Sequence, residues 1–397
     1  MHKRRDFLKR SALVTAGSLL APQFLSAGKM LLGTNYQGKK LVVVQLGGGN
    51  DGLNTIVPFR NDIYYKLRPN LSIPASEVLP LNDELGLNPS LKALKKFYDN
   101  GELAVLNNVG YPNPDRSHFR SMDIWQSASD SDKYLKTGWL GRMLDATCPS
   151  DAGAYFGLEA GEQLSLAMKG ERMKGMAVDD VNRLYQSTRD QFLVGASHAH
   201  EHHEHQVDYL YKTLQDVKSS AAYLKEKSGL YSSKIDYPKN PLAKELRGVA
   251  QLINAGAESK IYYTSISGFD THARQKGKQG NLLKSVAESL DAFVTDLKVG
   301  GQFENSLVMV FSEFGRRVEE NGSEGTDHGT ANNVWLIGGK LKKAGVLNTA
   351  PDLVKLNNDD LIYTEDFRSV YATILNGWLA TNSNDVLGGE FSNLGFV

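Results

Sequence analysis

Three histidines lie in polar segments whose residue types could do chemistry: His118 in PNPDRSHFRSMD, His272 in SGFDTHARQ and His328 in GTDHGTANN. Of the nine histidines in the chain, His2 is near the N-terminus and five lie in the run HAHEHHEH at 198–205. A single histidine is more often a structural residue than a ligand. Three histidines that each have Asp, Ser or Arg as close sequence neighbours instead indicate a polar functional site.

Acidic residues follow three apolar runs that have the composition of buried strands. Asp51 follows 42–44, Asp270 and His272 follow 261–263, and Glu313 follows 307–311. In open α/β sheets, ligands bind beyond the carboxyl ends of the strands, so we expect these side chains at one edge. Carboxylates with one or two imidazoles suit Zn, Mn, Mg or Ca. We therefore expect one or two divalent metal ions, although Asp51 and Asp270 could instead cap the turns that follow them.

Ser117 stands where a proline-rich and asparagine-containing loop gives way to a helical pattern. At a helix N-terminus its hydroxyl would lie near the positive end of the helix dipole and near free N–H groups. Flanked by Arg116 and Arg120, it could be a nucleophile for an anionic ester or part of an anion-binding site, or a plain N-cap. A triad with His118 and Asp123 is conceivable, but adjacent Ser and His rarely point at each other, and no G-x-S-x-G motif supports it.

The segment LGGGNDGLN at 46–54 is glycine-rich but does not follow the G-x-G-x-x-G spacing, and no P-loop lysine follows it. It is better interpreted as a tight bend that lets the backbone approach a site and presents Asp51 to a cation. Asn50 and Asn54 would support that ligand from behind.

The remaining pattern predicts an α/β fold. Short apolar runs without polar alternation predict central strands at 41–44, 103–106, 261–263, 307–311 and 334–337. Helical spacing of apolar residues appears at 282–297 and 370–379. Strands that alternate with helices predict a mostly parallel sheet that is covered on both faces.

Composition bounds the class of protein. The chain has 397 residues, 41% hydrophobic and 23% charged, with 45 basic and 45 acidic residues, so nothing indicates nucleic acid or an anionic membrane as partner. The single cysteine, Cys148, excludes an intramolecular disulfide framework. We expect it to be a small buried hydrophobic residue.

The N-terminus has the features of an export signal. Five basic residues within MHKRRDFLKR precede the apolar run SALVTAGSLLAPQFLSA, which is too short and too weakly apolar for a membrane span. RRDFLK resembles the twin-arginine signal, so the twin-arginine translocase is an expected partner and the periplasm or the extracellular space the expected location. Cleavage near Ala27 would remove five basic residues and one acidic residue, leaving 40 against 44 and a net charge of −4.

The rest of the chain, 28–397, is predicted to be a single domain with a variable, His-rich insertion at about 180–245. The histidine run at 198–205 lies at or before the start of an amphipathic helix, where a solvated surface segment is favoured over a weak transition-metal site. No internal repeat of fixed period is present.

At this point the motifs GGNDGLN, RSHF, GFDTH, FSEFGR and TDHGTANN resemble, in their order, an exported bacterial family known as domain of unknown function 1501. That family is grouped with the alkaline phosphatase/sulfatase-like superfamily, and the resemblance spans nearly the whole mature chain. It implies an alkaline phosphatase-like, doubly wound sheet and a dinuclear metal site around a Ser, Thr or Cys nucleophile.

The resemblance also implies roles for individual residues. Asp51 looks like the first-strand metal ligand, Ser117 like the nucleophile, Asp270 and His272 like an Asp…His ligand pair, and His328, with Asp327 beside it, like the late histidine ligand. Two departures stand out. The Asp…His pair is spaced by two residues where the superfamily usually has four, and Glu313 is followed by Phe314 where active members carry Asp-His. His118 could supply the missing imidazole.

These features favour an exported, metal-dependent hydrolase of phosphate or sulfate esters with Ser117 as nucleophile and Arg116 or Arg120 on the anion. Its substrate would be an anionic small-molecule or polymer ester. A non-catalytic, metal-binding or surface-assembly protein on the same scaffold is the alternative, supported by Phe314 in place of a ligand. A serine esterase without metal is a third hypothesis.

Overall fold

The computed structural model describes residues 38–149, 152–189 and 205–397. The predicted signal segment, 1–27, and nearly all of the histidine run at 198–205 lie outside the described residues. None of the described helices is both long enough and apolar enough to cross a bilayer.

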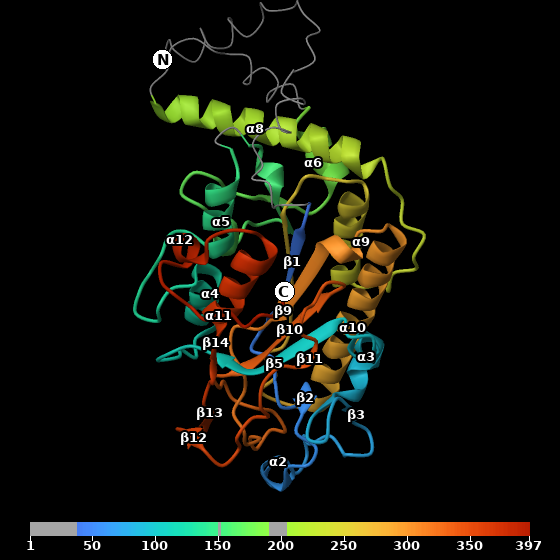
Figure 1. Ribbon diagram of the computed structural model, residues 1–397, viewed down its shortest axis with the longest axis vertical. Helices are drawn as coiled ribbons and strands as arrows, with labels where there is room; N and C mark the ends of the chain where they lie inside the picture. The colour runs from blue at the N-terminus through green and yellow to red at the C-terminus, as the bar shows by residue number, and fades with distance from the viewer. Residues whose placement is uncertain (1–37, 150–151, 190–204) are drawn as a thin grey trace, which may run out of the picture.

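A nine-stranded sheet forms the centre of the molecule (Figure 1). Its order is β11-β5-β10-β9-β1-β8-β6-β7, and β14 also pairs with β5. The strands are β1 (Lys40–Gly47), β5 (Leu103–Gly110), β6 (Gly157–Ala160), β7 (Met176–Val178), β8 (Ile261–Ser267), β9 (Ser306–Phe311), β10 (Asn332–Gly338), β11 (Gly345–Val346) and β14 (Glu365–Asp366). All five strands predicted from apolar runs are confirmed.

The sheet is mostly parallel, as predicted. β1 pairs in parallel with β8 and β9, with Val43 opposite Tyr263 and Met309. The exception is β10, which runs antiparallel between β9 and β5. The carboxyl ends of β1, β5, β8 and β9 therefore meet the amino end of β10 at one edge of the sheet.

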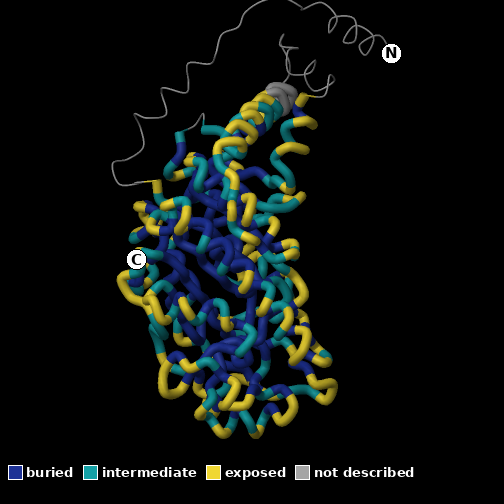
Figure 2. Tube along the Cα trace, turned by 90° about the vertical axis from the view of Figure 1, so that its right-hand side faces the viewer, coloured by how far each residue is buried: buried dark blue, intermediate teal, exposed yellow. Residues whose placement is uncertain are grey.

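Helices cover both faces, because side chains of β1 alternate between two separate hydrophobic cores. Val42 and Val44 pack in one core with α3 (Lys92–Asp99), α9 (Pro241–Asn254) and α10 (Gln275–Val299). Leu41 and Val43 pack in the other core with α4 (His118–Ser127), α5 (Trp139–Thr147) and α11 (Phe367–Thr373). Figure 2 shows this interior as continuous buried chain beneath exposed loops. The doubly wound α/β class is thus confirmed.

Both predicted helices are present. The pattern at 282–297 lies within α10, and the pattern at 370–379 begins in α11 and continues as a π-helical turn, Ile374–Trp378, before α12 (Ser383–Leu387). Cys148 is free and buried, and burial raises the pKa of its thiol, in agreement with the predicted unreactive, buried residue.

The predicted insertion at 180–245 contains α6 (Val181–Ser187) and α8 (His205–Ser228). α8 lies across one end of the molecule, and α2 (Asp62–Leu67) lies at the opposite end (Figure 1). Two small sheets, β2-β4-β3 and β12-β13, lie at the same end as α2 (Figure 1). Their strands are β2 (Ile56–Val57), β3 (Leu79–Pro80), β4 (Gly86–Leu87), β12 (Leu356–Asn357) and β13 (Asp360–Leu361). The limits of the domain and of its insertion stay predictions.

Candidate metal centre

The predicted functional residues come from segments that meet at the carboxyl edge of the sheet. His118 is the first residue of α4, which follows β5; Asp270 and His272 follow β8; Glu313 follows β9; Asp327 and His328 precede β10. Backbone pairing fixes the last of these segments, because Arg317 N donates to Asp327 O and Gly329 N donates to Gly315 O. His118 and His328, 210 positions apart in sequence, thus lie at the same edge.

Asp270 is the centre of a cluster of imidazoles. Its Oδ1 lies 2.9 Å from His272 Nε2, 3.1 Å from His328 Nε2 and 3.4 Å from His118 Nε2. The two nitrogens His272 Nε2 and His328 Nε2 are 3.0 Å apart. Single ligand atoms of His118, Asp270 and His328 all lie within 4.8 Å of one another.

The other ring nitrogen of each imidazole faces an oxygen acceptor. His118 Nδ1 lies 2.8 Å from Glu313 Oε1, His328 Nδ1 lies 2.9 Å from the carbonyl oxygen of Arg116, and His272 Nδ1 lies 3.3 Å from Asp327 Oδ1. These contacts favour the tautomer with the proton on Nδ1, which leaves the Nε2 lone pair toward Asp270. Histidine ligands of metals are oriented in this way.

This donor set fits a divalent metal ion. Lone pairs on two Nε2 atoms and a carboxylate oxygen repel one another unless a cation or extra protons lie among them. Two nitrogen ligands about 2.0–2.1 Å from one tetrahedral zinc ion are about 3.3 Å apart, near the 3.0 Å that separates His272 Nε2 from His328 Nε2. His118 Nε2 is buried and has no hydrogen-bond partner within the described part of the chain, as expected for an atom that a bound ion would complete.

The imidazoles differ in their charge environment. A hydrogen bond to the Glu313 carboxylate raises the pKa of His118. Burial lowers the pKa of His328, which favours its neutral, metal-binding form. Burial acts to raise the pKa of Asp270, but the hydrogen bond from Arg316 and the positive charge of its guanidinium outweigh it and hold this carboxyl well below its usual range. Asp270 is therefore a carboxylate at neutral pH.

Arg316 holds the loops of the site together. Its side chain is fully buried, and its guanidinium donates to Asp270 Oδ1 at 2.7 Å. It also donates to the carbonyl oxygens of Gly48 and Gly49 after β1, of Phe269 after β8 and of Thr326 before β10. One fixed cation thus orients the central carboxylate and contributes positive charge next to any bound ion.

Glu313 lies behind His118. Besides His118 Nδ1, its Oε1 accepts from Gly48 N at 2.8 Å, and its Oε2 accepts from Ser312 Oγ at 3.1 Å. The side chain is 1% exposed. Glu313 is therefore placed to orient an imidazole, and the predicted direct ligand role does not match this position. Asp327, on the exposed side, holds His272 in a similar way.

Asp51 lies outside the imidazole cluster, whereas the sequence predicts it to be a metal ligand. Its Oδ2 accepts from Arg68 Nη1 and from Gln275 Nε2, both at 2.5 Å. Its Oδ1 accepts from the backbone N–H groups of Leu53 and Asn54, at 3.2 and 3.4 Å. Asp51 and Arg68 side chains are both fully buried. The capping alternative describes Asp51 well, because a fully hydrogen-bonded carboxylate that is paired with an arginine offers no free lone pair to a metal.

The glycine bend has the expected close backbone approach. Gly48 has φ of +117°, and a Cβ there would lie 2.4 Å from Asp270 N. Asn54 Oδ1 accepts from Tyr64 and Arg68, and Asn50 Oδ1 accepts from Gln279. These amides thus support the Asp51 network and not the imidazole cluster.

Ser117 is exposed and directly precedes α4, but its side chain does not cap the helix. Its backbone N–H donates to Asp115 Oδ1 at 2.6 Å. Among the described residues, Ser117 Oγ has no hydrogen-bond partner, so this hydroxyl is free beside His118.

The two predicted anion-binding arginines have different surroundings. Arg120 is buried, and its guanidinium donates to the carbonyl oxygens of Asp130, Ser131 and Lys133; it is structural. Arg116 is 39% exposed and pairs with the buried Asp360. Arg317 lies on the other side of Asp360, with Nε 3.9 Å from Oδ1, and is 33% exposed.

Phe314 occupies the position after Glu313 where an imidazole was expected from the resemblance. Its ring is 2% exposed and packs 4.8 Å from the ring of His118 and 4.9 Å from that of His328. A Cβ on Gly49 would lie 2.2 Å from this ring. An apolar ring therefore closes one side of the cluster.

The sequence did not predict four residues that contact the site: Arg68, Gln275, Arg316 and Arg317. The adjacent arginines in FGRR were the available signal for the last two, since a buried arginine next to a predicted ligand needs a carboxylate partner. Nothing local marks Arg68 or Gln275 as partners of Asp51, because each lies on a separate element.

Several solved structures resemble the chain. The PsFucS1 sulfatase from Pseudoalteromonas sp. is 12% identical over 88% of this chain and 68% of its own, with a TM-score of 0.40. The lipoteichoic acid synthase LtaP from Listeria monocytogenes is 10% identical over 86% and 73%, with a TM-score of 0.37. The C-terminal periplasmic domain of EcEptC from Escherichia coli, in complex with Zn, is 12% identical over 77% and 75%, with a TM-score of 0.37.

At these identities the similarity concerns the fold alone. The comparison with curated proteins gives no match. A family model described as "Protein of unknown function (DUF1501)" matches residues 38–377, which span the central sheet and the whole imidazole cluster. The chain belongs to this family.

Proposed function

We propose that the protein is an exported, metal-dependent hydrolase of phosphate or sulfate esters that uses one divalent ion. The observation that carries the proposal is the convergence of three imidazole Nε2 atoms on Asp270 Oδ1, each ring being held from behind by an oxygen acceptor. Histidine-rich donor sets favour Zn or another borderline metal over Mg and Ca. His118, Asp270, His272 and His328 are the proposed ligands, and Asp51 is replaced in this role.

The number of ions follows from the charges around the site. Arg68 neutralises Asp51, and Arg316 already shares Asp270 Oδ1. A second ion would need further carboxylates to offset the repulsion between two cations, and would also face the Arg316 guanidinium. We therefore expect one equivalent of metal per chain.

The residues around the ion have distinct tasks in the proposed reaction. A bound divalent ion would polarise the ester oxygen and stabilise the negative charge that develops in the transition state. Ser117 Oγ would bond to the phosphorus or sulfur as the bond to the leaving alcohol breaks, and the hydroxyl proton of Ser117 would end on that alcohol. Water would then release phosphate or sulfate and restore Ser117. The positive end of α4 favours negative charge on Ser117 Oγ. Arg116, joined by Arg317, holds the anionic group of the substrate. Arg120 has no direct part, since its Nε and Nη2 donate to the 130–133 loop and its guanidinium lies over the ring of Tyr134.

Metal analysis tests the proposal without any substrate. Protein prepared without a histidine tag should retain one equivalent of metal, and chelation should release it. Two equivalents would show that the single-ion assignment is wrong, and a folded protein that binds no metal at micromolar concentration would overturn the proposal.

Turnover of aryl phosphates, phosphodiesters and aryl sulfates then tests the nucleophile. Ser117→Ala should abolish hydrolysis while metal content stays unchanged, and Asp123→Ala, an exposed residue of α4, should leave both unchanged. Hydrolysis that survives Ser117→Ala would exclude this nucleophile. Hydrolysis that needs Ser117 but survives complete chelation would favour a serine esterase.

A non-catalytic, metal-binding protein is the second candidate, favoured by Phe314. Its ring covers the side of the cluster between His118 and His328, where substrate or a further ligand would otherwise approach. One bound metal together with the absence of hydrolysis over the whole panel would support this candidate.

Export by the twin-arginine route is part of the proposal and is supported by the RRDFLK segment and by the free, buried Cys148. A conservative Arg4→Lys/Arg5→Lys variant should accumulate in the cytoplasm with its signal uncleaved. Normal export of that variant would argue for another route.

A further inference from the structure

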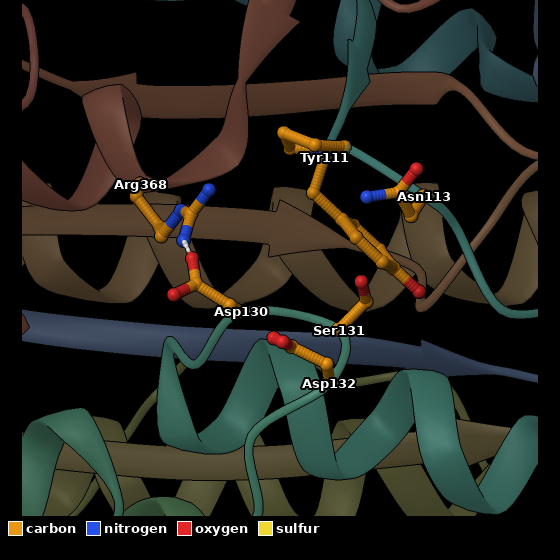
Figure 3. A pocket seen from close by; sticks show the side chains of 7 residues that line it. Tyr111, Asn113, Asp130, Ser131, Asp132 and Arg368 are labelled. Atoms are coloured by element: carbon orange, nitrogen blue, oxygen red, sulfur yellow. Dashed lines mark hydrogen bonds and ion pairs between the residues drawn. The ribbon is translucent and has the colours of Figure 1, made fainter.

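A second cavity lies outside the metal centre, between the end of β5 and the loop that joins α4 to α5. It has a volume of about 290 Å³ and is lined by residues 111–113, residues 130–132 and Arg368 of α11. Figure 3 shows Tyr111 and Asn113 on one side and Ser131 and Asp132 on the other, with Arg368 paired to Asp130. The volume is at the lower end of the range for small-molecule sites, enough for one ring-sized group.

The cavity is close to the candidate nucleophile. Asn113 lies four residues before Ser117, and successive Cα atoms are 3.8 Å apart, so the two Cα atoms are at most about 15 Å apart. Tyr111 also joins the two places, because its hydroxyl lies 3.0 Å from Ser121 Oγ in α4 and accepts from Asp115 N at 3.3 Å. A molecule with its ester at Ser117 could therefore reach the cavity with its other end.

The far wall of the cavity is a fixed loop. Arg120, buried in α4, donates to the carbonyl oxygens of three loop residues, of which Asp130 and Ser131 line the cavity. Its guanidinium also lies 3.9 Å from the ring centroid of Tyr134, whose side chain is 78% exposed. Arg120 thus holds the loop in place on both sides of Asp132.

The charges in the cavity disfavour an anion. Asp130 is paired with Arg368 at 2.5 Å and with Lys133 at 2.7 Å, whereas Asp132 has no ion pair within the described part of the chain. Arg368 is in turn shared with Asp366. The carboxylates therefore outnumber the free positive charges, and a sulfate or phosphate group would be repelled.

The donors in the cavity also disfavour an ammonium group. An ammonium can only donate, and it would face the Arg368 guanidinium and the amide nitrogen of Asn113. A hydroxyl group both donates and accepts, so it can pair with a carboxylate on one side and with guanidinium or amide N–H on the other. Several such hydroxyls on one ring, with an apolar ring face toward Tyr111, match the polar and aromatic groups that line the cavity.

We propose that this cavity binds a neutral, hydroxyl-bearing ring such as a pyranose. The ring would be the alcohol part of the ester, with the anionic group at Ser117 and Arg116. That the ring belongs to the substrate rests on the proposed function, whereas its binding does not require hydrolysis.

Direct binding tests the inference. Saturation-transfer NMR on the purified protein should detect at least one of the methyl glycosides of glucose, galactose, mannose, xylose and fucose, and neither ethanolamine nor sulfate should displace it. Asp132→Ala and Asn113→Ala should each weaken binding about fivefold, the effect of losing one hydrogen bond. Asp236→Ala, an exposed carboxylate beside another pocket, is the matched control and should have no effect.

The outcomes separate this inference from the proposed function. Ser117→Ala should bind the glycoside unchanged although it lacks hydrolytic activity. No glycoside binding at tens of millimolar, displacement by ethanolamine, or binding that Asp132→Ala leaves unchanged would each overturn the inference. Glycoside binding in a protein that hydrolyses no ester would leave the inference standing and refute the hydrolase alone.

Discussion

Asp51 and Asp270 have similar positions in the chain and different surroundings in the fold. Each follows a central parallel strand, β1 or β8, at the same edge of the sheet. Asp51 is buried with Arg68, and four donors use its two oxygens. Asp270 is 47% exposed, and three imidazoles and one guanidinium converge on one of its oxygens.

The difference shows what makes a carboxylate a ligand at such an edge. Asp51 is surrounded by N–H donors that carry their own hydrogens, so its lone pairs are already used. Asp270 faces nitrogens whose protons are held on the far side of each ring, so it shares a space with lone pairs that only a cation can satisfy. The partners, and not the position after the strand, separate a structural carboxylate from a binding one.

Removing Asp51 should give the largest effect on stability. Asp51→Ala would leave the Arg68 guanidinium buried without its counter-charge, and such losses cost about 3–5 kcal/mol. Chemical denaturation in the presence of chelator measures this free energy of unfolding without a contribution from metal. A double variant, Asp51→Leu/Arg68→Met, removes both charges and should recover most of the loss.

Asp51→Ala also tests whether Asp51 is separate from the metal centre around Asp270. If Asp51→Ala loses less than about 1 kcal/mol of stability but also loses its metal, Asp51 is a ligand and the comparison between the two carboxylates fails.

Removing Asp270 should have a large effect on metal affinity and a smaller effect on stability. Asp270→Ala takes away the central ligand, and we expect metal affinity to fall more than 100-fold, beyond the loss typical of residues behind the ligands. The cost in stability should be smaller than for Asp51→Ala, because Asp270 is 47% exposed and Arg316 keeps four carbonyl acceptors. Titration with Zn²⁺ and metal analysis measure the first effect, and chelator-treated denaturation the second. Unchanged metal affinity would place the ion elsewhere.

The general architecture could be predicted from the sequence because buried parallel strands have a strong local signature. The runs at 41–44, 261–263 and 307–311 are continuous and β-branched, and the rule for carboxyl ends of strands placed Asp270 and His272 at the right edge. The antiparallel direction of β10 has no such signature. It follows from the connection that carries His328 back toward the same edge.

The distribution of tasks within the site could not be predicted in this way. Whether Asp51 binds a metal or pairs with an arginine depends on Arg68, 17 residues away in sequence, and on Gln275, 224 residues away. Whether Glu313 binds a metal or orients His118 depends on the entry angle of α4. Both are long-range packing outcomes, and the spacing of residues within a motif carries no information on them.

Glu159 extends the comparison to a buried carboxylate that has no ion pair among the residues the structure describes. It lies in β6, 8% exposed, with one oxygen accepting from Ser165 N, and burial raises its pKa to about 7. The folded state therefore keeps a proton that the unfolded chain releases above its ordinary pKa near 4.5. Its contribution to stability is fully present below pH 4.5 and is lost as the pH rises toward 7, by up to about 3 kcal/mol.

Glu159→Gln should flatten this pH dependence, because a neutral amide has no proton to lose. Urea denaturation between pH 5 and 8 measures it, with Glu162→Gln, an exposed neighbour, as the matched control. Equal slopes in the variant and the parent would show that Glu159 is ionised in the folded protein.

Glu313 gives the finest test, since it differs from both aspartates by acting through another residue. Its carboxylate accepts from His118 Nδ1, and Glu313→Gln keeps the shape while removing the charge that makes His118 a better donor to a metal. We expect metal affinity to fall about 10- to 100-fold with little change in stability.

Asp327→Asn is the matched variant. The contact of Asp327 with His272 is longer, 3.3 Å, and exposed to solvent, so the loss of metal affinity should be smaller. A loss as large as that of Asp270→Ala would instead make Glu313 a ligand, and no loss at all would mean that His118 is positioned by the helix alone.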